Sequence, residues 1–88
     1  MQSVEKHDQE LIKDLLKKYI GEGKIDKNYT HDELATFSNV SIPVISRIAN
    51  RKSLVNLLTF AYLIKALDID ANEFFDEFAQ HSKFFNQD

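Results

Sequence analysis

The sequence predicts an all-α protein, a compact five-helix bundle that forms a single domain. Apolar residues recur at steps of three and four along several segments, which is the spacing of one helical face. The 88 residues contain only two glycines and one proline, so few positions interrupt a helix, and no segment alternates as a strand would. A chain of this length buries one modest core, and we expect residues 1–88 to form one domain.

The first helix is predicted from an apolar stripe that stops at a glycine. Its members are Leu11, Ile12, Leu15, Leu16, Tyr19 and Ile20. Gly21 follows, and glycine is common just beyond a helix C-terminus, so we expect the helix to end near this residue. Residues 22–28 are then predicted to form a polar loop.

The second helix is predicted to begin at His31 and to be short. Thr30, just before this helix, and Glu33, in its first turn, have the spacing of a capping box. In a capping box the side chain of each residue accepts a hydrogen bond from the backbone N–H of the other. The polar run that begins at Ser38 is expected to end this helix within a few turns.

A tight turn and a third helix are predicted next. Asn39 is expected at the turn because asparagine tolerates the left-handed backbone region. Ser41 can cap the third helix, and Pro43 then falls in its first turn, where the missing N–H of proline has no consequence. The expected apolar seam beneath these two helices consists of Leu34, Val40, Ile45 and Ile48.

Two further N-caps predict the last two helices. Asn56 precedes apolar residues that keep the helical period, and Asp70 precedes a fifth helix that runs from about Ala71. The apolar positions of the fourth helix are Leu57, Phe60, Leu63, Ile64 and Leu67.

Composition argues against several classes of protein. Without cysteine the chain has no disulfide, no thiolate metal site and no thiol nucleophile. The three histidines are far apart and none belongs to a metal-ligand pattern, so we expect no metal, no cofactor and no enzymatic activity. The longest apolar run, residues 60–64, is too short to cross a bilayer. We expect a cytoplasmic protein that does not bind membranes.

Charge is segregated along the sequence. The 34 residues from Leu34 to Leu67 hold four basic side chains and no acidic one. The other seven basic residues and all 14 acidic ones lie outside this window. Such segregation indicates a surface that faces a polyanion, and the alternative is that a mostly buried segment excludes carboxylates. The basic residues of the window are Arg47, Arg51, Lys52 and Lys65.

Residues 11–75 resemble the Xre or lambda-repressor-like helix-turn-helix regulators. The resemblance is carried by the order and spacing of four segments, whose sequences are THDELA at 30–35, NVS at 39–41, ISRI at 45–48 and KALDIDANEFF at 65–75. It implies a dimeric DNA-binding transcription regulator, usually a repressor, whose third helix, at about 42–49, enters the major groove of double-stranded DNA.

The resemblance also implies which residues contact DNA. His31, Arg51 and Lys52 match positions that contact phosphate. The family often has glycine at the position of Arg51. The positions that match the groove-facing surface are Ser41, Ile42, Pro43, Ser46, Arg47 and Asn50, with Val44 at its edge.

Side-chain chemistry assigns roles to some of these positions. Arg47 can bond guanine O6 and N7, and Asn50 can bond adenine N6 and N7. Ile42 and Pro43 can meet only thymine methyl groups, or else they belong to a surface that binds a protein.

Each of these polar residues also has a structural alternative. Arg47 can be an exposed helix charge without a partner, and Asn50 a helix C-terminal residue. Ser46 can simply face solvent, Ser41 is first a cap, and His31 can be an ordinary first residue of its helix.

The last quarter of the chain is rich in phenylalanine. Residues 76–88 extend beyond the family-like core, and we expect Phe78, Phe84 and Phe85 either to form a dimer interface or to cover the first helix within one monomer. If the fifth helix continues, Phe74, Phe78 and Phe85 share one face.

The sequence therefore predicts a homodimeric DNA-binding regulator. The alternative is a protein-interaction module, such as an antitoxin or phage-type regulator, that binds a partner protein.

Overall fold

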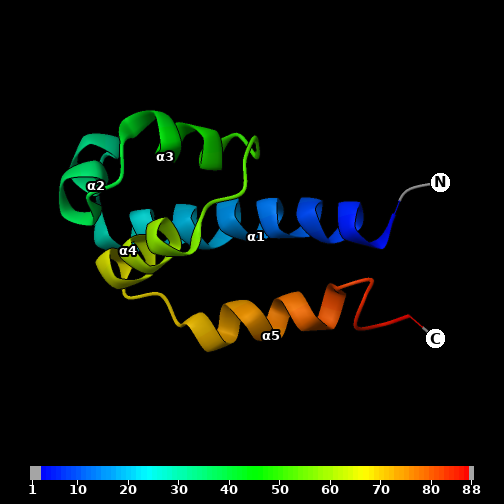
Figure 1. Cartoon of the computed structure of the whole chain (residues 1–88). Helices are drawn as coiled ribbons and strands as arrows, with labels where there is room; N and C mark the ends of the chain where they lie inside the picture. Colours follow the sequence, from blue (N-terminus) through cyan, green and yellow to red (C-terminus); the bar gives the residue numbers. More distant parts are fainter. Residues whose placement is uncertain (1–2, 88) are drawn as a thin grey trace.

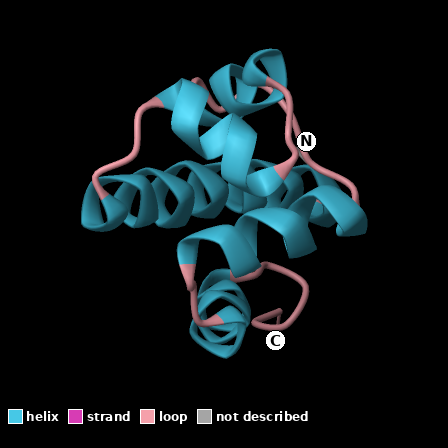
Figure 2. Cartoon of the chain, turned by 90° about the vertical axis from the view of Figure 1, so that its left-hand side faces the viewer, coloured by secondary structure: helices cyan, strands magenta, loops and turns pink. Residues whose placement is uncertain are grey.

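A computed structural model describes residues 3–87, and within them all regular structure is helical. Figure 2, which colours the chain by secondary structure, contains helices and loops only. The all-α class is therefore confirmed. The helices are α1 (Val4–Lys27), α2 (His31–Ser38), α3 (Ile42–Ala49), α4 (Leu57–Leu67) and α5 (Ala71–His81).

The long helix α1 is the centre of the fold. It contacts α3, α4 and α5, whereas α2 contacts α3 and α4. In Figure 1, α3 lies above α1 and α5 runs below it. The surface formed by α3 and the surface formed by α5 are thus on opposite sides of α1.

The first helix is longer than the sequence predicts, and the expected end near Gly21 is wrong. Residues 22–27, expected to be a loop, continue α1, which ends where Asn28 adopts a left-handed conformation. Gly23 is buried, and a Cβ atom at this position would lie 3.1 Å from Cβ of Leu67. Gly23 therefore allows the close approach of α1 and α4 and does not end the helix.

The turn between α2 and α3 agrees with the sequence in most details. Thr30 and Glu33 form both bonds of the capping box. Asn39 ends α2 with a left-handed φ of 57°, and Pro43 lies in the first turn of α3. Ser41 occupies the N-cap position, as predicted, but its side chain makes no capping hydrogen bond within the described residues. The prediction that the Ser41 side chain caps α3 is therefore wrong.

One apolar core joins all five helices. Its buried members include the whole seam that the sequence predicts beneath α2 and α3. The N-caps predicted at Asn56 and Asp70 are confirmed, since both side chains accept backbone N–H groups of the helices that follow them. The buried core residues are Leu15, Leu16, Ile20, Leu34, Val40, Ile45, Ile48, Leu63, Leu67 and Phe74.

The C-terminal segment turns back onto the start of α1. Helix α5 ends at His81, so Phe85 does not continue the helical stripe of Phe74 and Phe78. Ser82 is fully buried, and its hydroxyl donates to Asp8 Oδ2 over 2.7 Å. Asp8 also accepts the backbone N–H of Lys83 over 2.8 Å, and these bonds hold the segment against α1.

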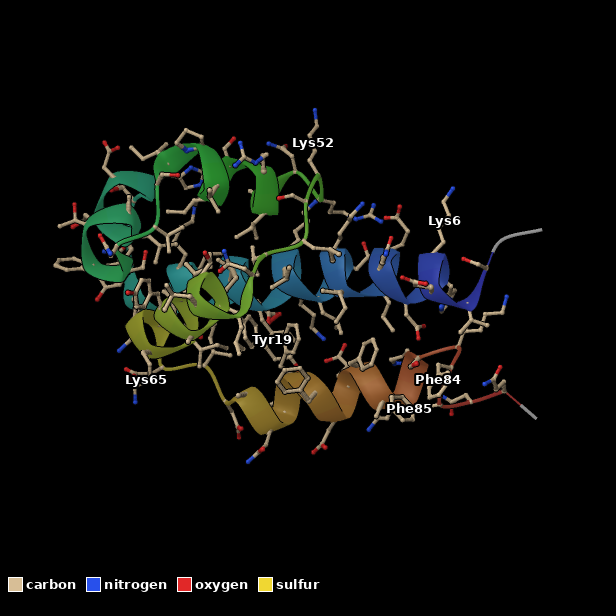
Figure 3. The ribbon with its side chains drawn as sticks, in the orientation of Figure 1. Lys6, Tyr19, Lys52, Lys65, Phe84 and Phe85 are labelled. Carbon is tan, nitrogen blue, oxygen red and sulfur yellow. The ribbon has the colours of Figure 1, made fainter. Side chains whose placement is uncertain are left out.

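Phe78 packs against the core, so its ring contributes to the monomer. Phe84 and Phe85 are mostly exposed, at 56% and 66%, and Figure 3 places both beside the end of α5. Within residues 3–87, no helix is both long enough and apolar enough to cross a membrane.

Candidate nucleic-acid interface

Helix α3 has a buried face and an outer face that follow from its helical period. Ile45 and Ile48 point into the core, and the half-buried Val44 packs against it. The predicted edge residue Val44 is therefore directed toward the core. The predicted outward residues that are exposed are Ser41, Ile42, Pro43, Arg47 and Asn50, and Ser46 is half-buried.

Arg47 is the most accessible charged group on the outer face of α3. It is exposed, and none of the ion pairs formed within residues 3–87 includes it. Its guanidinium keeps five N–H donors in a planar fork, a shape that matches two acceptors on one guanine edge. The buried Ile48 next to it fixes the helix against the core, so the backbone that carries Arg47 is held in place.

Asn50 has a local role that limits its availability. It is the C-cap of α3, and its side-chain amide donates to the backbone oxygen of Ser46 over 2.9 Å. One N–H and the amide oxygen are left for another partner. A bidentate contact with adenine uses one N–H and the oxygen, so this bond and the adenine contact are chemically compatible.

The first turn of α3 presents both polar and apolar groups. The hydroxyl of Ser41 is exposed and is not used for capping, which leaves it able to donate to a phosphate oxygen. Ile42 is 44% exposed and Pro43 is exposed beside it. These two side chains form a small apolar surface next to the polar groups of the same face.

The chain leaves α3 through a residue with left-handed backbone. Arg51 has a φ of 58°, a conformation that glycine adopts most readily after the end of a helix. Its N–H donates to the oxygen of Ile48, and the N–H of Lys52 donates to the oxygen of Arg47 over 2.9 Å. This pair of bonds is a Schellman motif.

Arg51 and Lys52 differ in how free their charges are. The Arg51 guanidinium forms an ion pair with Asp14 of α1. Lys52 is exposed and projects away from the body of the molecule (Figure 3). Of the three predicted phosphate contacts, Arg51 is in an ion pair, whereas His31 and Lys52 belong to no ion pair among the described residues.

The basic window of the sequence does not form a single surface. Lys65 lies on α4, and Figure 3 shows it projecting to the opposite side from Lys52. The expectation that the whole window faces a polyanion is therefore wrong for Lys65. Its place on that face is taken by lysines of α1 that lie outside the window.

Lys17 and Lys24 of α1 join His31 around a hollow of about 140 Å³ between α1, the start of α2 and the end of α3. Lys6 projects to the same side as Lys52 (Figure 3). Lys24 was not predicted to lie on this face because the first helix was expected to end near Gly21. The seven-residue spacing of Lys17 and Lys24, which places two residues on one helical face, is a signal that could have found them.

The acidic residues gather on the other side of α1. A hollow between α1 and α5 is lined by Asp70, Glu73, Asp76 and Glu77. Tyr19 donates to Glu77 over 2.7 Å and Lys18 donates to it over 3.0 Å. These bonds lower the pKa of Glu77, and the bond to Glu77 together with burial raises the pKa of Tyr19 to about 12. The hollow beside α5 is thus lined mainly by acidic residues, whereas Lys17 and Lys24 lie beside α3.

Within residues 3–87, no three histidine, aspartate or glutamate side chains lie close enough together to hold a metal ion. No family model matches the chain, and searches of curated proteins and of solved structures found no significant match. We therefore infer a function from the geometry and chemistry of the α3 face.

Proposed function

We propose that this protein is a sequence-specific DNA-binding transcription regulator, a cytoplasmic repressor that acts as a homodimer. The observation that carries the proposal is the outer face of α3, a short helix anchored in the core by Ile45 and Ile48. Arg47 is exposed on this face and belongs to none of the ion pairs formed within residues 3–87. A helix of this kind fits the major groove, where arginine distinguishes guanine from the other bases.

The proposed contacts divide into two kinds. Arg47 and Asn50 bond base edges, and Ile42 and Pro43 meet thymine methyl groups. Ser41, Lys52, His31, Lys17 and Lys24 lie around this face, and they contact phosphates and fix the orientation of α3 on the duplex. Phosphate contacts give affinity for any DNA, whereas the base contacts give sequence preference.

The apolar surface at the other end of α1 supports the proposed homodimer. A groove of about 530 Å³ lies between the start of α1 and the C-terminal segment, lined by Phe78, Phe84, Phe85 and Leu54. Phe84 and Phe85 are 56% and 66% exposed, so two rings of about 150 to 250 Å² each present roughly 180 to 300 Å². This area is a substantial part of the about 800 Å² that each partner buries in a standard interface.

The proposal is tested by selecting bound duplexes from a random library and measuring the affinity for the selected and for a scrambled sequence. We expect a half-site that contains guanine and thymine, repeated at about one helical turn because two copies bind together. Recovery of no enriched sequence, together with equal affinity for all duplexes, would contradict the proposal.

A second candidate is a protein-interaction module of the antitoxin type. It is favoured by the same apolar groove and by the apolar pair Ile42 and Pro43 on the outer face of α3. A partner that covered this face would exclude DNA. A protein that binds no duplex at low salt but forms a stable complex with a second protein through α3 would establish this alternative.

A further inference from the structure

Arg51 is the exception among the left-handed residues of this protein. The non-glycine residues with positive φ in residues 3–87 are Asn28, Asn39, Arg51 and Asp68. Asparagine and aspartate tolerate this region because their short polar side chains bond locally. Arginine has no such advantage, and the left-handed conformation costs an ordinary residue about 1 kcal/mol or more.

The backbone at this position does not require arginine. The Schellman bonds use the N–H groups of Arg51 and Lys52 and the oxygens of Ile48 and Arg47, and any residue other than proline could form them. The left-handed conformation costs Arg51 free energy, and the backbone bonds do not call for arginine. This combination indicates that the arginine side chain itself has a role at this position.

The side chain of Arg51 is held by a carboxylate. Asp14, which lies on the face of α1 turned toward the end of α3, forms the ion pair with its guanidinium. Both side chains are about half exposed, at 47% for Arg51 and 52% for Asp14. An exposed pair of this kind stabilises a protein only slightly, because water and salt screen it. The pair can therefore open at little cost.

A carboxylate resembles the acceptor that Arg51 would meet on DNA. Carboxylate and phosphate oxygens both accept the planar fork of a guanidinium. Arg51 also adjoins Lys52, which projects into solvent beside α3. Both side chains leave the backbone at the end of α3, on the side of the molecule where the proposed function places the duplex.

We propose that Asp14 acts as an internal substitute for a DNA phosphate, which holds Arg51 in the free protein and releases it when DNA binds. This inference rests on the proposed function and adds an internal contact that limits the affinity of the protein for DNA. Asp14 competes with phosphate and not with a base. It therefore weakens binding to all duplexes by the same factor and leaves the ratio between selected and random sequences unchanged.

The test compares Asp14→Asn with Glu22→Gln, a matched control. Both variants remove one negative charge from an exposed position of α1, but Glu22 lies with Asp26 and Asp70 on the acidic side of the molecule. We expect Asp14→Asn to tighten binding about two- to fivefold at low salt on selected and random duplexes alike. The control should change affinity much less. Asp14→Ala serves as a second variant that cannot bond Arg51 at all.

The same substitutions in an Arg51→Ala background separate competition from a general charge effect. Without Arg51, Asp14→Asn should tighten binding no more than Glu22→Gln does. A gain that persists without Arg51, or an equal gain from both substitutions, would overturn the inference while the proposed function stands. If neither the wild type nor Asp14→Asn binds any duplex at low salt, both proposals are wrong.

Discussion

Arg47 carries the clearest prediction at the scale of single residues. We expect Arg47→Ala to weaken binding to the selected duplex by about 1 to 3 kcal/mol and to relax the preference at one base pair of each half-site. The fold should be unaffected because the side chain is exposed. Fluorescence anisotropy on duplexes substituted at each position measures both effects. Equal losses on selected and random duplexes would show that Arg47 contacts only phosphate.

The two glycines of α1 provide a matched pair for stability. A Cβ at Gly21 would meet nothing within 4 Å, whereas a Cβ at Gly23 would lie 3.1 Å from Cβ of Leu67. Gly21→Ala should therefore stabilise the protein by about 0.5 to 1 kcal/mol through helix propensity. Gly23→Ala should destabilise it by about 1 kcal/mol, because α4 must move away. Urea unfolding measures both, and shifts of the same sign would contradict the packing described for α1 and α4.

Single residues also show what the sequence can and cannot predict about the site. Asn39 and the Thr30 capping box were predicted correctly because each depends on neighbours in the sequence. The ion pair between Asp14 and Arg51 joins residues that are far apart along the chain, and no local pattern indicates it. The exposure of Arg47 was predictable from the helical period, whereas the neutralisation of Arg51 was not.

At the scale of the elements, α1 and the C-terminal segment depend on each other. Burial of the Asp8 carboxyl raises its pKa, but hydrogen bonds from Ser82, His7 and the backbone of Lys83 and Phe84 outweigh this effect and lower the pKa to about 2. The bonds are strongest to the ionised group, so the segment is held most firmly when Asp8 carries its charge.

The pH dependence follows from this lowered pKa. Asp8 contributes stability that is fully present above its ordinary pKa of 3.8 and is lost as the pH falls through about 2. We expect Asp8→Asn to lower the thermal unfolding midpoint at neutral pH. The midpoint of the variant should also fall less steeply than that of the wild type as the pH decreases from 3.8 to about 2. Thermal unfolding across this pH range measures both. If the midpoint of the variant decreased with pH as steeply as that of the wild type, Asp8 would not hold the segment.

The boundaries of the elements were predicted where caps mark them. The starts of α2, α4 and α5 follow polar residues whose side chains bond the first turn. The end of α1 was not predicted, because the sequence does not reveal that Gly23 lies against Leu67 of a distant helix. That error also hid Lys24 from the candidate site.

At the scale of the whole molecule, the two ends of α1 have separate proposed roles. We propose that the surface around α3 binds DNA and that the groove beside the C-terminal segment joins two copies. The sequence left two alternatives for the terminal rings, the monomer core and a dimer interface. Phe78 packs on the core, and Phe84 and Phe85 are exposed, so a dimer interface remains a prediction for these two rings.

The dimer is tested with substitutions that spare the core. Phe84→Ser combined with Phe85→Ser should give a folded monomer, because both rings are mostly exposed, and should weaken binding to a two-site duplex far more than to a single half-site. Sedimentation of the wild type and the variant at micromolar concentrations measures assembly directly. A wild type that sediments as a monomer with and without the two-site duplex would contradict the proposed interface.

The salt dependence of DNA binding tests the central proposal most directly. We propose to measure the affinity of the wild type and of the Arg51→Ala, Lys52→Ala double variant for the selected and a random duplex across a range of salt concentrations. We expect the affinity to fall steeply with salt and the selected duplex to stay preferred. The double variant should flatten the salt slope by up to about two units on both duplexes. A slope near zero for the wild type, or a slope that the double variant leaves unchanged, would contradict the assignment of the α3 face as a DNA-binding surface.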